Sequence, residues 1–394
     1  MAITRRGLLG AAAFLPLAGR LHLDGSGDLT GSGDLIDLRR DLHAHPELSG
    51  QEVYTSGVVA QRLLAAGLDV TTGVGGYGVV GVLRGARKGR TVAYRADMDA
   101  VPAQGQIDGG PDTAHVCGHD IHTTVGVGVA EALARRRRSL EGTFVFVFQP
   151  GEETLTGASA MLADHVFDRA APAEIHALHC GPFPAGQFAV MPRYGMSGLD
   201  RALVTLPDAA TAQSVAAAIN ALGTTRFPRT PELRAQFVEY LRTPGSPIAE
   251  FVFMNASAVD AQVRVSYRCW PEERYTSIRQ EIERLAAPGT VAYPGDPFPA
   301  MVVGEREGLA VERHLRRAAD SVTRLHASNP YNGEDMALFL KRLPGTWTYL
   351  GVRHPDRALD TSYPHHGSFD PDERAIAHGV HAMTGWLAER GACR

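Results

Sequence analysis

The sequence predicts an α/β fold, in which a mostly parallel mixed sheet is flanked by helices and a small α+β lid domain is inserted. Short β-rich runs alternate with helical stretches in the first half of the chain, and the pattern changes after Gly195 and returns near the C-terminus. The length of 394 residues also exceeds the size at which one hydrophobic core usually keeps growing. We therefore expect a main domain made of two sequence segments, interrupted by the lid.

The first half supplies most of the predicted sheet. The pattern is helical from Leu35 and again over residues 57–66, and β-rich runs follow at 79–83, 91–95, 143–148 and 174–178, with helical stretches at 124–135 and 158–164 between them. Such alternation is typical of a layered α/β domain with a parallel sheet. Ligands bind beyond the carboxyl ends of such strands. Candidate residues that follow these runs closely are therefore expected at one edge of the sheet.

The second half contains the predicted lid and the return to the main domain. A strand over 202–206, an alanine-rich helix over 211–222, a strand over 262–268 and a helix over 277–285 indicate the small α+β insert. The chain then has a predicted helix over 308–325, a strand over 346–350 and a helix through Trp386. The predicted boundaries are 35–196 and 301–394 for the main domain and 197–300 for the lid.

Residues 1–34 are predicted to be an export signal and a linker. Arg5 and Arg6 precede an apolar stretch over 8–18, and no acidic residue occurs before Asp24. Paired arginines before an apolar segment favour the twin-arginine route, which leads to an extracellular or periplasmic location. The stretch is too short for a permanent membrane anchor. A disordered cytoplasmic leader is the alternative.

Charge and cysteine content narrow the function classes. The net charge of −4 gives no electrostatic footprint for nucleic acid, and the basic run 135–138 is interpreted as the cationic end of a helix. Four scattered cysteines are too few for a disulfide scaffold. Because Cys117 lies among histidines, we expect metal rather than sulfur as its partner.

Several polar clusters have the chemistry of a metal site. Cys117 and His119 offer thiolate and imidazole, the usual donors for zinc and similar ions, and Asp120 could orient an imidazole. Glu152 and Glu153 follow an apolar run, and because neighbours on an extended chain face opposite ways, one can bind metal while the other faces substrate or water. The further candidates are His179, His365 and His366. Each cluster is ambiguous alone, but together they supply what a two-metal hydrolytic site needs.

These clusters belong to a familiar set of motifs. In order along the chain they are Arg39-Arg40-Asp41-Leu42-His43 with Pro46-Glu47-Leu48, Arg95-Ala96-Asp97-Met98-Asp99-Ala100-Val101-Pro102, Cys117-Gly118-His119-Asp120, Gln149-Pro150-Gly151-Glu152-Glu153, Gly333-Glu334-Asp335, and His365 with Phe369 and Glu373. The chain thereby resembles the aminoacylase-type metallopeptidase family (peptidase family M-twenty), in the subgroup of hippurate hydrolase and auxin-conjugate (IAA-amino acid) hydrolases. The resemblance runs from residue 35 to the C-terminus.

The resemblance implies a zinc-exopeptidase-like catalytic domain and a role for each matching residue. Two divalent ions, with zinc expected and manganese, cobalt or nickel also suitable, would be held by Cys117, His119, Glu153, His179 and His365, for which His366 is the alternative. Glu152 would be the general base, Asp99 would belong to the catalytic set, and Asp97 and Asp99 would support the ligands. The implied reaction is hydrolysis of the amide bond of an N-acyl amino acid or a related small N-acyl compound by metal-activated water.

The lid departs from the family pattern. Relatives carry a Gly-Gly-His-Ala-type loop after the first lid strand, whose His reaches the active site of a neighbouring subunit, whereas no His occurs here between His179 and His314. The family's homodimer is therefore left open. Asn255 and Arg268 keep the family spacing and are expected to contact the carbonyl and the carboxylate of the substrate, since an Arg can clamp a carboxylate with two hydrogen bonds.

Two other functions remain open at this point. Cys117 could act as a nucleophile paired with a nearby His. The protein could also be a family member with weakened or lost catalysis that binds a metal or a ligand.

Overall fold

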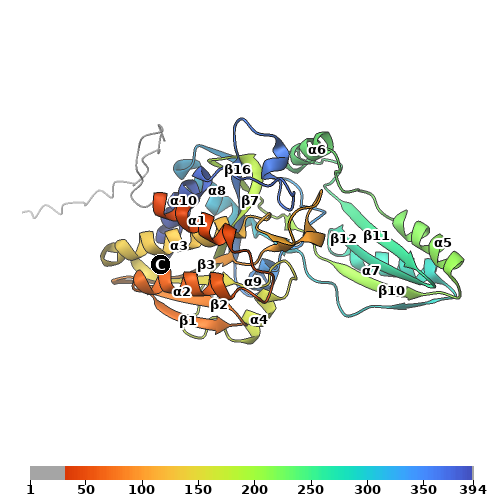
Figure 1. Ribbon diagram of the computed structural model, residues 1–394, viewed down its shortest axis with the longest axis horizontal. Coiled ribbons are helices and arrows are strands. Elements are labelled where there is room, and N and C mark those ends of the chain that lie inside the picture. The colour runs from red at the N-terminus through yellow and green to blue at the C-terminus, as the bar shows by residue number, and fades with distance from the viewer. Residues whose placement is uncertain (1–31, 393–394) are drawn as a thin grey trace, which may run out of the picture.

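The computed structural model describes residues 32–392, which form a broad α/β body and a narrower lid that projects from it (Figure 1). The predicted export signal and Cys393 lie outside the described residues. Helix α1 (Ser32–Ala44) begins inside the predicted linker, which therefore ends earlier than expected. None of the helices in residues 32–392 is both long enough and apolar enough to cross a membrane.

The body is built on an eight-stranded mixed sheet with the order β1-β2-β6-β3-β7-β16-β8-β15. Its strands are β1 (Asp69–Val74), β2 (Gly78–Arg84), β3 (Arg87–Asp97), β6 (Glu141–Gln149), β7 (Ile175–Pro184), β8 (Gln187–Val190), β15 (Ser321–Arg324) and β16 (Gly345–Arg353). The central strands β6, β3, β7 and β16 run parallel to their neighbours in that group, whereas β1 and β2 are antiparallel additions. The predicted fold class is confirmed.

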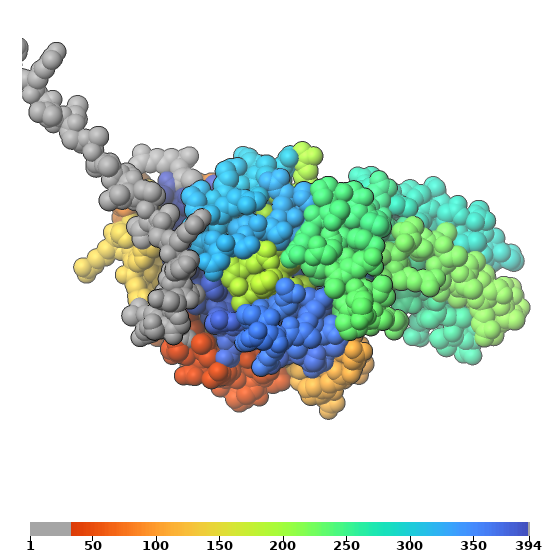
Figure 2. Space-filling model, turned by 90° about the horizontal axis from the view of Figure 1, so that it is seen from above, coloured from red at the N-terminus to blue at the C-terminus, as the bar shows by residue number. Residues whose placement is uncertain are grey.

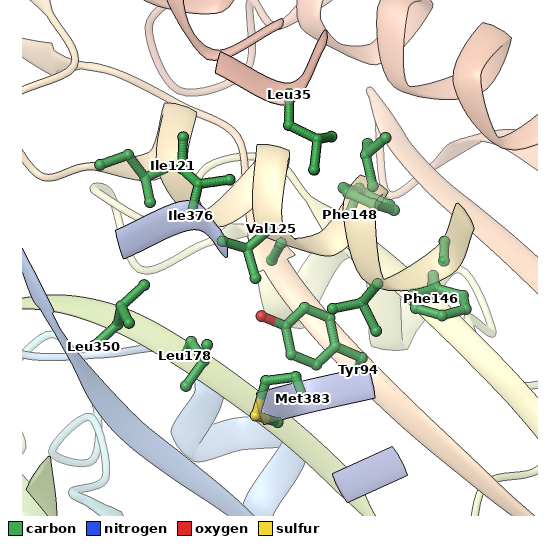
Figure 3. Packing of buried hydrophobic residues seen from close by; sticks show 14 of the residues in the cluster. Leu35, Tyr94, Ile121, Val125, Phe146, Phe148, Leu178, Leu350, Ile376 and Met383 are labelled. Atoms are coloured by element: carbon green, nitrogen blue, oxygen red, sulfur yellow. The ribbon is translucent and has the colours of Figure 1, made fainter. Parts of the chain in front are cut away.

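Helices cover both faces of this sheet. One face carries α1, α2 (Val53–Ala65), α3 (His119–Arg135), α8 (Glu305–Ala318) and α10 (Arg374–Ala392), and the other carries α4 (Gly157–Ala163) and α9 (Met336–Leu340). Because successive strand residues point to opposite faces, Val79 and Val80 belong to different hydrophobic clusters. Figure 3 shows the first cluster, where Val125 of α3 packs near Tyr94 of β3 and Leu178 of β7.

The lid has a separate antiparallel sheet with the order β11-β12-β10-β13. Its elements are β10 (Asp200–Thr205), α5 (Ala209–Asn220), β11 (Phe251–Val259), β12 (Gln262–Trp270), α7 (Arg274–Ala286) and β13 (Thr290–Ala292). Helices α5 and α7 pack on one face of this sheet through a third hydrophobic cluster. Asp208 accepts a hydrogen bond from the Thr211 amide at 2.8 Å and so caps α5, which begins four residues after β10 ends.

The chain crosses between body and lid at a short strand pair. Strand β9 (Gly195–Met196) precedes the lid, β14 (Met301–Val302) follows it, and the two pair antiparallel. The remaining short elements are β4 (Val101–Pro102), η1 (Ala103–Gly105), β5 (Thr113–Ala114), η2 (Arg137–Ser139) and η3 (Leu359–Ser362).

Two features of the second half differ from expectation. The helix predicted over 308–325 ends at Ala318, and Ser321–Arg324 is instead strand β15, paired in parallel with β8. Residues 321–324 form a strand because they pair with β8, which is distant in sequence. The helical periodicity alone therefore placed the end of the helix too late. Helix α6 (Pro231–Arg242) was not predicted, and it lies against the body although residues 197–300 were assigned to the lid.

Candidate metal centre

The predicted site residues meet at the carboxyl ends of three neighbouring parallel strands. Asp97 ends β3, Glu152 and Glu153 follow β6, and His179 lies within β7. In register, Asp97 is opposite Gln149 of β6, while Arg95, two residues earlier, is opposite a residue of β7. The strand ends are thus aligned, as expected for the ligand-binding edge of such a sheet.

A glycine turn brings Cys117 and His119 to the same edge. His119 is the first residue of α3, and Gly118 before it has φ +89°, in the left-handed region. A Cβ on Gly118 would lie 2.6 Å from Cys180 Sγ, so both the conformation and the space require glycine. The short spacing between the thiol and the imidazole therefore depends on this one residue.

All three predicted imidazole ligands are oriented in the same manner. The Nδ1 atom of His119 lies 3.3 Å from Asp99 Oδ1, that of His179 lies 2.8 Å from the Cys180 carbonyl oxygen, and that of His365 lies 3.0 Å from the Gly105 carbonyl oxygen. A ring that donates its Nδ1–H to an oxygen keeps the Nε2 lone pair for an ion. In His119, His179 and His365, the oxygen next to Nδ1 therefore favours the tautomer whose Nε2 is free to bind a metal ion.

The five predicted ligands converge. Donor atoms of Cys117, His119 and Glu153 all lie within 4.8 Å of one another. His179 Nε2 is 3.5 Å from Cys117 Sγ, and His365 Nε2 is 3.4 Å from Glu153 Oε1. His119 Nε2 and Glu153 Oε1 are buried without a hydrogen-bond partner. One thiolate, three imidazoles and one carboxylate fit a divalent ion such as zinc, and a cation would satisfy the two orphaned atoms.

The charges around the cluster also call for cations. Burial and then Glu153 and Glu152 raise the pKa of the Cys117 thiol well above its usual range. Burial opposes protonation of His119, but Asp97 and Asp99 raise its pKa to about 10. Without a cation, both groups thus keep their protons, and bound metal displaces such protons.

Glu152 is separate from these five groups. Its Oε2 is 3.9 Å from His119 Nε2, and its carboxylate groups with those of Glu334 and Asp335 within 4.8 Å. Burial, and then Glu334, raises the pKa of Glu152 well above its usual range. A carboxylate in this position, beside the ligands and prone to bind a proton, has the properties of a general base.

Asp99 lies behind the ligands. Its Oδ2 accepts hydrogen bonds from Ser49 Oγ at 2.6 Å and from the Glu153 amide at 2.9 Å, while its Oδ1 faces His119 Nδ1. Asp99 thus positions two ligands at once. This geometry agrees with the supporting role that the resemblance implies for Asp99, and its part in the catalytic set stays a prediction.

The alternative ligand His366 points elsewhere. Its Nδ1 is 2.9 Å from Ser368 Oγ, and its Nε2 is 3.0 Å from Asp108 Oδ2. His365 adopts φ +67°, a conformation that turns it toward Glu153 while the next residue faces away. The geometry therefore favours His365.

The two lid residues share the open face of the lid sheet. Asn255 is exposed on β11 opposite Ser266, which lies two residues before Arg268 on β12. Arg268 Nη1 donates to the carbonyl oxygens of Ser197 and Gly198 at 3.3 and 3.0 Å. Its guanidinium also lies close to Gly333, next to the loop that carries Glu334. Arg268 thus reaches the edge of the centre, whereas Asn255 lies farther out along the lid.

Sequence reasoning assigned no role to Arg95, which is the centre of the buried charge network. The side chain is fully buried and donates to Gln149 Oε1 at 2.9 Å, Asp97 Oδ2 at 2.6 Å and Asp335 Oδ1 at 3.0 Å, with Glu334 Oε1 also at 3.0 Å. Its occurrence inside a motif was the available signal. The motif alone does not show that Arg95 contacts Glu334 and Asp335, which lie far away in the sequence.

His122 was also missed. Its Nδ1 is 2.5 Å from Asp97 Oδ1, and its Nε2 accepts the Cys180 amide at 2.7 Å. Both nitrogens are thus in use and His122 positions Asp97, although donor atoms of Asp97, His119, His122 and His179 also lie within 4.8 Å of one another. His122 lies two residues beyond the motif Cys117-Gly118-His119-Asp120, and only the fold shows which atoms its two nitrogens contact.

Comparison with known proteins agrees with this geometry. The family model of peptidase family M20/M25/M40 matches residues 93–389. The chain belongs to this family. It is 28% identical over 372 residues to the N-acetylcysteine deacetylase of Bacillus subtilis, covering 87% of this chain and 93% of that protein. It is also 28% identical over 399 residues to the N-acetyldiaminopimelate deacetylase of Bacillus pumilus, covering 90% of this chain and 98% of that protein.

A solved structure gives the same result. The YXEP protein of Bacillus subtilis, described as a dinuclear metal-binding peptidase of the M20 family, matches with a TM-score of 0.71 at 25% identity, over 92% of this chain and 99% of that chain. Together with the converging donors, this identifies the M20 family member described here as a binuclear metallohydrolase that acts on amide bonds.

Proposed function

We propose that this M20 hydrolase cleaves the amide bond of an N-acyl amino acid or a related small N-acyl compound, with Glu152 as general base. The observation that carries the proposal is the position of Glu152, which follows strand β6 and lies beside the five converging donors. The names of two relatives, both deacetylases of N-acetylated amino acids, support the substrate class. A place in the hippurate and auxin-conjugate subgroup, zinc as the metal, and export through the N-terminal segment are parts of the same proposal.

Each group of the site has a distinct task. Two bound divalent ions would polarise the amide carbonyl and make water acidic. Glu152 then accepts the proton of the attacking water at its carboxylate and passes it to the departing nitrogen. Asp99 holds His119 and the Glu153 backbone in place meanwhile.

Arg268 fits the carboxylate of the amino-acid half. Its hydrogen bonds go to backbone carbonyls only among the described residues, and burial lowers its pKa to about 10. An anion from the substrate would provide the missing charge partner with two parallel hydrogen bonds.

The test is a hydrolysis screen of the metal-loaded protein over N-acetyl, N-benzoyl and indole-acyl amino acids. Glu152→Gln should lower kcat by about 10²–10⁴-fold, the usual contribution of a general base, while bound metal measured by elemental analysis stays unchanged. Glu283→Gln, an exposed carboxylate on α7, is the matched control and should retain full activity. Metal binding without turnover of any amide, unchanged by Glu152→Gln, would instead support a binding protein that has lost catalysis.

A further inference from the structure

The first motif of the chain runs into a loop, residues 45–52, that joins α1 to α2 and lies against the catalytic body. Leu48 forms a parallel bridge with Ala100, and the Glu47 carbonyl oxygen accepts the Ala100 amide at 2.7 Å. Figure 2 shows the red start of the described chain beside the blue C-terminal part on the surface of the body, away from the lid. The loop is therefore fixed directly next to Asp99.

Glu52, the last residue of this loop, reaches the turn that carries the proposed base. Its Oε1 accepts the Gly151 amide at 2.8 Å and the Gly50 amide at 3.0 Å. Gly151 directly precedes Glu152 and has φ +66°, in the left-handed region that favours glycine. The side chain of Glu52 thus holds the backbone at the point where it enters Glu152.

The other side of Glu152 is held in the same way. The Glu153 amide donates to Asp99 Oδ2 at 2.9 Å, and Ser49 Oγ of the loop donates to the same oxygen at 2.6 Å. Asp99 and Glu52 are both fully buried. The amides before and after Glu152 therefore each end on a buried carboxylate, and the loop supplies one of these carboxylates and orients the other.

The position of Glu52 is unfavourable for stability alone. Its side chain is 0% exposed, and its Oε2 has no hydrogen-bond partner among residues 32–392. Burial raises the pKa of its carboxyl group above the usual range. A buried polar atom without a partner costs free energy, and an apolar side chain would fill the same space without this cost. The contact of Oε1 with the Gly151 amide explains the residue better than packing does.

We propose that Glu52 is a positioning residue that holds the Gly151 amide and so fixes the Glu152 carboxylate at the metal centre. The inference rests on the proposed function, in which Glu152 takes the proton of the attacking water, and it adds the group that orients this base. A general base acts only within hydrogen-bond reach of the proton that it removes. Misplacement by about 1 Å can lower a rate by about 10²-fold. Loss of the Glu52 contact should therefore lower kcat more than it changes KM.

The kinetic test compares Glu52→Met with Glu52→Gln in metal-loaded protein that hydrolyses an N-acetyl amino acid. Methionine keeps the length of the side chain but has no oxygen, so kcat should fall by about 10–100-fold while KM changes little. Glutamine keeps an oxygen at the same distance, so Glu52→Gln should retain most of the wild-type kcat. Glu52→Asp, whose carboxylate is one bond shorter, should behave like Glu52→Met and replaces it if the methionine variant does not fold.

Glu47→Met is the matched control. Glu47 is a carboxylate of the same loop that also accepts two backbone hydrogen bonds, from the Tyr54 and Thr55 amides at 2.8 and 2.9 Å. These bonds hold the start of α2 and not the Glu152 turn, so their loss can lower the Tm but should leave kcat unchanged. An equal fall in kcat for Glu47→Met and Glu52→Met, or a Glu52→Gln variant as slow as Glu52→Met, would overturn the positioning role.

Hydrogen exchange tests the Glu52–Gly151 contact without the reaction. An amide that is bonded to a buried carboxylate exchanges only when that hydrogen bond opens. Glu52→Met should therefore speed exchange at Gly151 by about tenfold, whereas Glu47→Met should speed it only at Tyr54 and Thr55. If the wild type hydrolyses no N-acyl amino acid, the proposed function fails while this measurement still decides the contact. Unchanged exchange at Gly151, or an unchanged kcat in folded Glu52→Met with normal metal content, overturns the inference.

Discussion

Substitution of Arg95 by Met tests whether the buried charge network stabilises the catalytic body. Methionine keeps much of the side-chain length but removes the charge, and it leaves Asp97, Glu334 and Asp335 without their shared cation. All of these side chains are buried, so water cannot compensate. Removal of one partner of a buried ion pair typically costs about 3–5 kcal/mol. Because Arg95 serves three carboxylates, we expect the upper part of that range.

The assay is thermal and urea unfolding of metal-free protein. A loss of about 4 kcal/mol corresponds to a fall in Tm of roughly 8–16 °C for a domain of this size, at about 2–4 °C per kcal/mol. Arg84→Met is the matched control, because Arg84 is half exposed and its contact with Asp69 is 3.6 Å long. Such surface pairs contribute only about 0–1 kcal/mol.

A second substitution identifies the cause. In the double variant Arg95→Met with Asp335→Asn, one of the uncompensated carboxylates is gone, so part of the lost stability should return. If Arg95→Met unfolds within about 1 kcal/mol of the wild type, or if Asp335→Asn makes the single variant worse by the same amount as it does the wild type, the charge argument is refuted.

Three further predictions concern metal, pH and substrate. Chelation should lower the Tm of the wild type, because an ion that binds only the folded state stabilises that state. The Glu152→Gln variant should show the same drop in Tm. An equal Tm with and without chelator would contradict the metal centre. Burial alone would raise the pKa of Glu174, but His176 and Arg390 lower this pKa to about 2. Ionised Glu174 therefore stabilises the fold by about 3 kcal/mol above pH 4.5. This stabilisation is lost as the pH falls from 4.5 toward 2. Urea unfolding should therefore show a gap between wild type and Glu174→Gln that closes over this range, whereas a gap independent of pH would indicate packing alone. Arg268→Lys should raise the KM for N-acyl amino acids but not for N-acyl amino-acid amides, which lack the free carboxylate. An equal rise in KM for both kinds of substrate would contradict the role of Arg268 in binding the carboxylate.

Much of the site could be predicted because its donors occur in compact motifs. Cys117 and His119 are separated by one glycine, and Glu152 and Glu153 are adjacent, so the chemistry is visible in the sequence. The ends of parallel strands meet at one edge, which joins these motifs without knowledge of the fold's details. The proximity of Cys117 to His119 follows from their spacing, and that of Glu153 to His179 follows from the neighbouring strands.

Other assignments needed contacts between distant segments. His365 and His366 are neighbours in sequence, and only the Gly105 carbonyl and Asp108 separate their roles. Asp99 was expected both to support the ligands and to belong to the catalytic set, and only the structure shows its hydrogen bonds with Ser49 and the Glu153 amide. Side-chain direction and hydrogen-bond partners of this kind are not properties of a local pattern.

The sequence by itself therefore determined the α/β class, and it predicted an inserted lid and, through the resemblance, a donor set from Cys117 to His365. Strand and helix periodicity and short motif spacing are local, so they are legible along the chain. The tertiary structure decided which nitrogen of each histidine faces the centre, that Arg95 joins the buried carboxylates, and that α6 packs on the body. These depend on long-range packing and on burial, which removes water as an alternative partner and makes each contact specific.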